Sequence, residues 1–425
     1  MNIYQAKEEI SNTVKAYFLK DEKGNSKIPE LRQRPILLMG PPGVGKTQIM
    51  QQISEELNIG LVSYTITHHT RQSAVGLPIV SKKVYDGVER EVTEYTMSEI
   101  ISGIYEYMEK TGHRRGILFI DEINCVSETL MPMMLQFLQV KTFGNQKLPK
   151  DWIIVAAGNP SEYNKQVREL DVVTLDRVRL INVEPDIDAW KIYAVNRNVH
   201  RSILSYLDVK ADNFYKVYSD VDGLKFVTAR GWEDLSILLY SYEELGITIT
   251  EDIIYEYLRD REVAEDFLSF YDLYTKYSKD YEIELILKAS VDAAVYARLN
   301  NAEYDEKLIL INLLLERLDK DFKEANDNAK ELEKAKAVST DYDMSLELKA
   351  GVATEMANSN LDNTIKFIKE GLDEGSMLIF ITNLTLSENA AIFLLNNPNK
   401  NYLEYADKLL INSKKRKILS ELNAM

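Results

Sequence analysis

Apolar residues in the first part of the chain fall into short continuous runs separated by stretches at helical spacing. The continuous runs predict strands over residues 35–39, 61–67, 116–120 and 152–157. The stretches around them predict helices over residues 1–20, 48–57, 98–110 and 127–138. Strands that alternate with helices in this way are typical of an α/β domain built on a parallel sheet.

Two turn signals in the same part of the chain predict β-hairpins. Asp86-Gly87 lies inside the stretch from Val84 to Val88, and Asp-Gly is a preferred two-residue hairpin turn. A second candidate hairpin turns near Gly144-Asn145, shortly before the strand over 152–157. We expect both hairpins to leave the α/β core as inserts.

The pattern changes near Glu184-Pro185, beyond which helical spacing dominates. We therefore expect a first domain over 1–185, a second domain of short, tyrosine-rich helices over 186–280, and a helical third domain over 281–425. Short loops are expected at 358–360 and 396–399.

One long helix is predicted from Leu308 onward, because apolar residues there alternate steps of three and four. This heptad spacing predicts a seam that packs against a partner helix. The partner is either a helix of the same domain in an antiparallel hairpin, which we favour, or a helix of another chain. The seam residues are Leu308, Ile311, Leu315, Leu318, Phe322, Ala325, Ala329 and Leu332.

Composition and charge narrow the class of protein. With 425 residues, 45% of them hydrophobic and 28% charged, the chain is long enough for two or three globular domains. Its net charge of -16 weighs against nucleic acid as the main substrate, because phosphate backbones would be repelled. Cys125 is the single cysteine, which excludes a disulfide framework within the chain. We find no apolar leader and no run long enough for a membrane span, so we expect a cytoplasmic protein.

The segment between the strand at 35–39 and the helix at 48–57 fits the phosphate-loop pattern GxxxxGK[ST]. Glycines in such a loop let backbone N–H groups converge on phosphates at a helix N-terminus. We expect Lys46 to reach the β and γ phosphates of a nucleotide and the Thr47 hydroxyl to ligate Mg²⁺. The alternative is a glycine-rich turn with an incidental lysine. The candidate phosphate-binding residues are Gly40, Pro41, Pro42, Gly43, Val44, Gly45, Lys46, Thr47 and Gln48.

Polar residues follow two of the predicted strands. Asp121 and Glu122 end one apolar strand, and Asn159 follows the next. In a doubly wound sheet all three emerge at the carboxyl edge, beside the phosphate loop, where we expect Asp121 to bind the nucleotide's Mg²⁺. Glu122 is then the candidate base for the attacking water, and Asn159 the candidate to orient that water. The alternatives are a solvated acidic turn and a turn-forming asparagine before Pro160.

Arginines follow these strands. Arg177 is a candidate arginine finger, a residue that contacts the nucleotide of a neighbouring subunit, and Arg168 and Arg179 are its rivals. An ordinary salt bridge is the alternative role for each of the three. Arg230 begins a predicted helix and is a candidate to bring a second positive charge over the phosphates.

Taken in order, these motifs resemble the MoxR branch of AAA+ ATPases, related to the dynein-type and McrB-type modules. The resemblance covers residues 30 to about 245 and departs from the family at Cys125 and Val178, where a basic residue and Phe are common. The two hairpins correspond to the helix-2 insert and the pre-sensor-1 hairpin. The resemblance assigns Lys46 and Thr47 to Walker A, Asp121 and Glu122 to Walker B, Asn159 to sensor 1, Arg177 to the finger and Arg230 to sensor 2.

This resemblance implies both a fold and a function. The fold is a P-loop α/β core with a parallel sheet flanked by helices, followed by an all-helical lid over 186–280 and an extra helical C-terminal domain. The function is Mg²⁺-dependent ATP hydrolysis by a ring of subunits, six being expected, that remodels a protein client. Such clients often carry a von Willebrand factor A domain. The alternatives are a nucleic-acid motor or McrB-like GTPase, and a nucleotide-gated scaffold with slow turnover.

Overall fold

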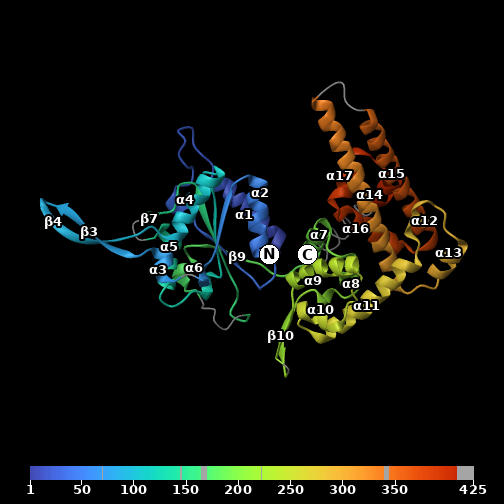
Figure 1. Cartoon of the computed structure of the whole chain (residues 1–425), viewed down its shortest axis with the longest axis horizontal. Coiled ribbons are helices and arrows are strands. Elements are labelled where there is room, and N and C mark those ends of the chain that lie inside the picture. Colours follow the sequence, from blue (N-terminus) through green and yellow to red (C-terminus); the bar gives the residue numbers. More distant parts are fainter. Residues whose placement is uncertain (69, 144–145, 164–169, 222, 339–343, 409–425) are drawn as a thin grey trace, which may run out of the picture. The chain divides into compact units, whose positions relative to one another are not determined.

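The computed structural model describes the whole chain except residues 69, 144–145, 164–169, 222, 339–343 and 409–425 (Figure 1). The chain forms two compact units. The first contains Met1–Ala189 and Thr228–Arg230, and the second contains Trp190–Val227 and Gly231–Met425.

The first unit is built on a five-stranded parallel sheet with the strand order β2-β5-β8-β1-β9. The strands are β1 (Ile36–Met39), β2 (Gly60–Thr65), β5 (Gly116–Asp121), β8 (Trp152–Gly158) and β9 (Arg179–Asn182). Every residue of β8 is buried, as are all residues of β5 before Asp121. Burial on both faces explains why these strands are continuous apolar runs, since a parallel sheet is covered on both sides. The predicted α/β core with a parallel sheet is confirmed.

The helices of the first unit pack around this sheet (Figure 1). N-terminal α1 packs against α2, where Lys7 forms an ion pair with Glu56. In turn, α2 contacts β2 and β5, and α4 contacts β2. The bounds are α1 (Ile3–Tyr17), α2 (Lys46–Leu57), α3 (Arg71–Val75), α4 (Glu99–Thr111), α5 (Met131–Val140) and α6 (Val172–Leu175).

Helix α5 begins later than the predicted start at residue 127. The N–H groups of Leu130 and Met131 both donate to the carbonyl of Ser127, which forms a turn ahead of the helix. Pro132 then occupies the first helical turn, the place where its missing N–H costs nothing. The proline therefore marks the start of this helix, whereas the apolar spacing alone placed it too early.

The predicted hairpin at Asp86-Gly87 is confirmed as β3 (Pro78–Tyr85) and β4 (Val88–Tyr95), which extends away from the sheet of the first unit (Figure 1). Asp86 and Gly87 have φ values of 52° and 77°, and positive φ at both positions is what a type I′ turn requires. The second predicted hairpin pairs β6 (Thr142–Phe143) with β7 (Gln146–Lys147), and its turn at 144–145 lies outside the described residues.

The second unit is mainly helical. Its long helix α14 packs against α8 and α11 and also against α15, α16 and α17. The predicted division of this region into 186–280 and 281–425 stays a prediction. The helices are α7 (Ile187–Asn196), which begins in the first unit, α8 (Arg201–Val209), α9 (Ala229–Leu245), whose first two residues also belong to the first unit, α10 (Glu251–Tyr257), α11 (Arg261–Asp280), α12 (Ile283–Leu287), α13 (Ala293–Leu299), α14 (Tyr304–Val338), α15 (Met344–Gly371), α16 (Glu374–Leu386) and α17 (Glu388–Asn396).

The region predicted as an all-helical lid also contains a two-stranded hairpin, which corrects that detail. Strand β10 (Lys216–Asp220) pairs in antiparallel fashion with β11 (Gly223–Val227). Phe226 forms a further antiparallel bridge to Arg259, which ties the hairpin to the helices of this unit. The short strands sit between strong helical patterns, so the helical spacing around them masked their signal.

Helices α14 and α15 form the antiparallel hairpin that the heptad spacing favoured. Lys336 pairs with Glu347 near the hairpin's turn, and Asn360 Nδ2 donates to Asp321 Oδ2 at 2.8 Å farther down. The loop predicted at 358–360 is wrong, because α15 continues through it to Gly371. The Asn360 amide bonds to the facing helix instead of the local backbone, so it does not interrupt its own helix.

No single helix in the described ranges is both long and apolar enough to cross a bilayer. One bent pair, α16 with α17, meets the length and composition test jointly, with 89° between its two parts.

Candidate functional site

The phosphate loop connects β1 to α2. Gly43 and Gly45 have φ values of +73° and +93°, in the left-handed region that glycine enters without strain. Gly40 lies so close to the end of β9 that a Cβ there would be 2.8 Å from the carbonyl oxygen of Val183. The glycines are therefore required by the path of the backbone, and the loop ends where α2 begins at Lys46.

Lys46 is buried at the base of this loop, with 8% of its surface exposed. Its ammonium donates to the carbonyl oxygens of Gly40 at 2.7 Å and Pro41 at 2.9 Å, and to Asn159 Oδ1 at 2.8 Å. Burial lowers the pKa of Lys46 to about 8; the Asp121 carboxylate opposes this shift and the Arg230 charge adds to it. The ammonium is therefore held in place by polar oxygens that phosphate oxygens can replace.

Thr47 and Asp121 supply adjacent oxygens at the same edge of the sheet. The Thr47 hydroxyl, in the first turn of α2, donates to Asp121 Oδ2 at 3.1 Å, at the end of β5. A hydroxyl next to a carboxylate is the oxygen set that Mg²⁺ accepts beside nucleotide phosphates. The pair thus fits the predicted metal, and both residues remain our candidates for holding it.

Glu122 has a constrained backbone and a hydrogen-bond partner that the sequence analysis missed. Its φ is 57°, which is uncommon outside glycine, and its N–H donates to Asp121 Oδ1 at 2.9 Å. The Thr67 hydroxyl donates to Glu122 Oε2 at 2.9 Å. Thr67 follows β2, which is the neighbour of β5 in the sheet. A prediction of the strand order would therefore have placed Thr67 beside Glu122.

Asn124 positions the backbone of Asn159. Asn124 Nδ2 donates to the Asn159 carbonyl at 2.7 Å, and Asn124 Oδ1 accepts from the Asn159 N–H at 3.3 Å. Asn124 is 1% exposed, and a Cβ at Gly158 would lie 2.5 Å from its Oδ1. This buried side chain therefore fixes the position of the Asn159 backbone, directly after the end of β8. The sequence pattern assigns no role to Asn124, because its partner Asn159 follows a different strand.

The candidate finger arginines differ in their surroundings. Arg179 pairs with Glu9 and donates to Thr13, so it is engaged by α1 of its own chain. Arg177 is exposed and follows α6, whose Val172 and Val173 are also exposed, at 81% and 54%. Arg168 lies outside the described residues. Of the two described arginines, Arg177 is the more exposed, and its assignment as a finger stays a prediction.

The start of α9 lies against the phosphate loop. A Cβ at Gly43 would lie 2.9 Å from Thr228 Cβ, immediately before Ala229, where the helix begins. Arg230 is exposed there, and its charge is near enough to contribute to the lowered pKa of Lys46. The structure therefore places Arg230, Lys46, Asp121, Glu122 and Asn159 around one edge of the sheet.

Nucleotide affinity is expected to fall as the pH rises above about 8, the pKa of Lys46. Below that pH the ammonium is already protonated, whereas above it binding must take up a proton, because bound phosphates raise this pKa. The loss should approach about tenfold per pH unit. Titrating labelled ADP in EDTA between pH 7 and 9.5 measures it. Lys46→Arg, which stays charged, is the control and should give a flatter profile. A flat profile for the parent chain would contradict the prediction.

Comparison with known proteins agrees with this geometry. Residues 35–178 match the family model described as "AAA domain (dynein-related subfamily)". The chain is 30% identical over 125 residues to "ATP-dependent protease ATPase subunit HslU" of Caldicellulosiruptor saccharolyticus, covering 28% of this chain and 25% of that protein. It is 30% identical over 201 residues to "Lon protease homolog" of Acanthamoeba polyphaga mimivirus, covering 43% of this chain and 18% of that protein.

The chain thus spans a quarter or less of the length of each of these relatives. The matches support an AAA+ ATPase domain within the first unit, with nucleotide binding and ATP hydrolysis as its general activity.

Proposed function

We propose that this chain is a MoxR-type AAA+ ATPase that assembles into a ring in the cytoplasm and uses Mg²⁺-dependent ATP hydrolysis to remodel a protein client. One observation carries the enzymatic part. Lys46, the Thr47–Asp121 pair and Glu122 meet at a single sheet edge, at the start of a helix that points its N–H groups toward them. This is the set of groups that phosphoryl transfer to water needs.

The residues would act in a defined order. The loop N–H groups and Lys46 would hold the β and γ phosphates, and Thr47 and Asp121 would hold Mg²⁺, whose charge would offset that of the phosphates. When Lys46 turns to the phosphates, its 2.8 Å bond to Asn159 Oδ1 is released, and Asn159 becomes available to orient water. Glu122 accepts the proton of that water once it leaves the Thr67 hydroxyl. The Thr67 bond would thus hold the base away from the water until nucleotide is in place.

Ring assembly is supported by the surroundings of Arg177. A finger must reach a neighbouring subunit, and Arg177 is exposed beside the exposed apolar pair Val172 and Val173. Apolar side chains at the surface are typical of a contact with another protein, and Arg is favoured where a phosphate must be met. We propose that α6 and Arg177 contact the next subunit's nucleotide, with Arg230 acting on the nucleotide of its own chain.

Segments that lie outside the parallel sheet and its nucleotide site support the proposal of a protein client. The hairpin β3–β4 exposes Ile79, Val80, Val84 and Val88. We propose that this hairpin acts on the client, that the helices after residue 281 recruit it, and that the client carries a von Willebrand factor A domain. The net charge of -16 weighs against a nucleic-acid substrate.

Phosphate release tests the proposed activity. The purified chain is expected to hydrolyse ATP in Mg²⁺ and to lose hydrolysis in excess EDTA, because the transferred phosphoryl group then lacks its counter-charge. The same assay with GTP determines which nucleotide is preferred, and Lys46→Ala serves as the control for a contaminating ATPase. Undetectable turnover with both nucleotides would favour a nucleotide-gated scaffold, and hydrolysis that EDTA does not change would contradict the assignment of Thr47 and Asp121.

A further inference from the structure

The turn after β5 holds Glu122 and Asn124 in one small loop. A short 3₁₀ helix over Ile123–Cys125 begins directly after Glu122. The Cys125 N–H donates to the Glu122 carbonyl at 2.9 Å, which closes the turn. Because the two residues belong to the same closed turn, their backbones move together, and a contact that fixes Asn124 also fixes the point from which the Glu122 side chain starts.

The Asn124 amide binds the backbone of Asn159 with both of its polar atoms. Nδ2 donates to the Asn159 carbonyl, and Oδ1 accepts from the Asn159 N–H. Such a pair fixes the bound residue, because a shift along the strand direction lengthens one bond or misaligns the other. The two residues are 35 positions apart in the chain, so the pair fixes the end of β8 relative to the turn after β5.

Gly158 makes room for this contact. A Cβ there would lie 2.5 Å from Asn124 Oδ1 and 2.9 Å from Asn124 Cγ. The φ of Gly158 lies outside the left-handed region, so the backbone conformation does not require glycine at this position. The Asn124 amide does require it, because the amide occupies the space that a side chain on β8 would take. Both residues therefore serve the same contact with the end of β8.

Asn159 connects the turn after β5 to the phosphate loop. In the sheet, β8 lies between β5, which leads into the turn, and β1, which leads into the loop. The backbone of Asn159 is bound by Asn124, and its Oδ1 accepts from Lys46 Nζ at 2.8 Å. These hydrogen bonds cross three adjacent strand ends. If Lys46 turned to bound phosphates, the Asn159 amide would be released while the Asn159 backbone stayed held.

We propose that Asn124 is a positioning residue for hydrolysis, which holds Asn159 at the distance from Glu122 at which both side chains bind the same water. This inference rests on the proposed function, because it takes Glu122 as the base and Asn159 as the residue that orients the water. Asn124 acts through the backbone of Asn159. A displacement of about 1 Å between groups that must act together costs on the order of 100-fold in rate, so losing this contact has a large effect.

A double-mutant cycle in the full chain tests this role. Asn124→Ala should lower kcat for ATP about 100-fold and change the affinity for labelled ADP less than about threefold, because the phosphate loop and Lys46 are untouched. Asn159→Ala should lower kcat by a similar factor. The chain with both substitutions should be at most about threefold slower than Asn159→Ala, because Asn124 then has no side chain left to position.

The outcomes of this cycle separate two failures. Losses that multiply, to on the order of 10⁴-fold in the double variant, would show that Asn124 acts independently of Asn159 and would overturn the inference. If the parent chain turns over and the losses multiply, the proposed function stands and the inference alone falls. A parent chain without turnover removes the proposed function, and the inference with it.

Hydrogen exchange provides a measurement that does not depend on turnover. In the chain without nucleotide, the backbone amide of Asn159 should exchange at least about tenfold faster in Asn124→Ala than in the parent, because its acceptor is lost. Mass spectrometry of peptides that span residues 156–161 measures this rate. Unchanged exchange would show that other groups hold the end of β8, and it would overturn the inference.

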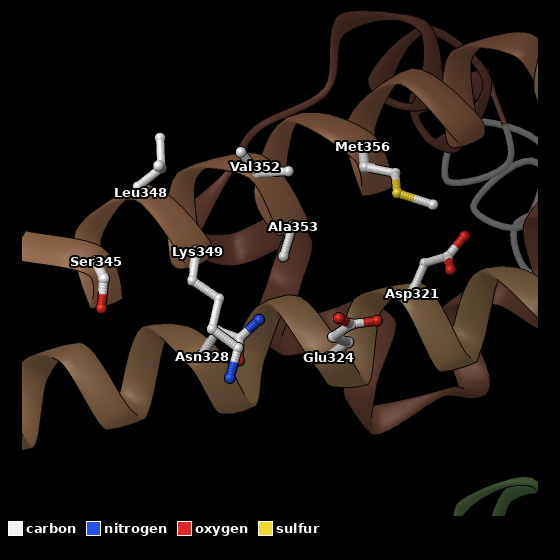
Figure 2. Close-up of a pocket in the computed structure, with 9 residues that line it drawn as sticks. All are labelled: Asp321, Glu324, Asn328, Ser345, Leu348, Lys349, Val352, Ala353 and Met356. Atoms are coloured by element: carbon white, nitrogen blue, oxygen red, sulfur yellow. The ribbon is translucent and has the colours of Figure 1, made fainter.

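Asn360→Ala is the matched control for a general loss of stability. Asn360 is also a buried asparagine, but its amide donates to Asp321, which lines a groove between α14 and α15 (Figure 2). Both Asn124→Ala and Asn360→Ala should melt at a lower temperature, because each leaves a buried polar group with fewer hydrogen bonds. Only Asn124→Ala should lower kcat.

An equal loss of kcat in Asn360→Ala would show that reduced stability accounts for both variants, and it would overturn the inference. If Asn124→Ala does not fold, Asn124→Asp takes its place in the cycle. The aspartate keeps the size of the side chain and the acceptor for the Asn159 N–H, but it lacks the donor for the Asn159 carbonyl. The same pattern of losses is expected from it.

Discussion

Glu122→Gln is expected to bind ATP as tightly as the parent chain and to hydrolyse it at least about 100-fold more slowly. The amide has nearly the shape of the carboxylate, so the loop and Lys46 should be undisturbed, but it cannot accept a proton from water. Thr67 can still donate to the amide oxygen, which keeps the side chain in position. Binding of labelled ATP and single-turnover phosphate release measure the two effects separately.

Lys46→Ala is the matched variant for the other half of this prediction. It removes the ammonium that the loop carbonyls and Asn159 hold in place, so nucleotide binding itself should be lost. The two variants thus fail at different steps, one at binding and one at chemistry. Turnover by Glu122→Gln at the parent rate would show that another group activates the water.

Arg177→Ala is expected to lower hydrolysis by about 10³-fold, the low end of the effect of an arginine finger, while leaving ATP binding intact. The missing guanidinium belongs to the neighbouring site in a ring. Mixing Arg177→Ala chains with Lys46→Ala chains should therefore restore part of the activity, because some interfaces then combine an intact loop with an intact finger. Steady-state hydrolysis at several mixing ratios measures the recovery.

The control for this experiment is Arg179→Ala. Arg179 pairs with Glu9 and Thr13 in its own chain, so its loss should lower thermal stability without creating a defect that mixing repairs. Full activity of the Arg177→Ala chain, or parent activity that persists in dilute monomers, would remove the basis for the ring. Recovery by Arg179→Ala mixtures instead would make Arg179 the finger.

The α/β core and the edge that carries the site could be predicted from the sequence, because the apolar runs that form parallel strands are short and distinctive. Each strand of such a sheet is buried on both faces, so it appears as an apolar run, and its C-terminal end meets the same edge as the others. The placement of Lys46, Asp121 and Asn159 at one edge follows from this rule alone. The hairpin at Asp86-Gly87 was equally local, since two residues with positive φ define its turn.

The extents of two helices depended on residues whose effect does not appear in the spacing of apolar positions. Helix α5 starts where Pro132 can be accommodated, and α15 continues through 358–360 because Asn360 finds Asp321 on the facing helix. The hairpin β10–β11 is stabilised by pairing within itself and to Arg259, a contact that a helical spacing count does not register. The residue that determines the structure is thus either a single proline within the segment, as in α5, or a partner from another segment, as for α15 and for β10–β11.

The sequence by itself determined which chemical groups are present and that they meet at the edge of a parallel sheet. Only the tertiary structure decided how they are held, because each restraint joins residues far apart in the chain. Thr67 bonds to Glu122 across neighbouring strands, and Asn159 bonds to Lys46. The ion pair between Arg179 and α1, which distinguishes Arg179 from Arg177 as a candidate finger, likewise joins residues far apart in the chain. A hydrogen bond depends on distance and direction, and those are set by the strand order and by the packing of α1.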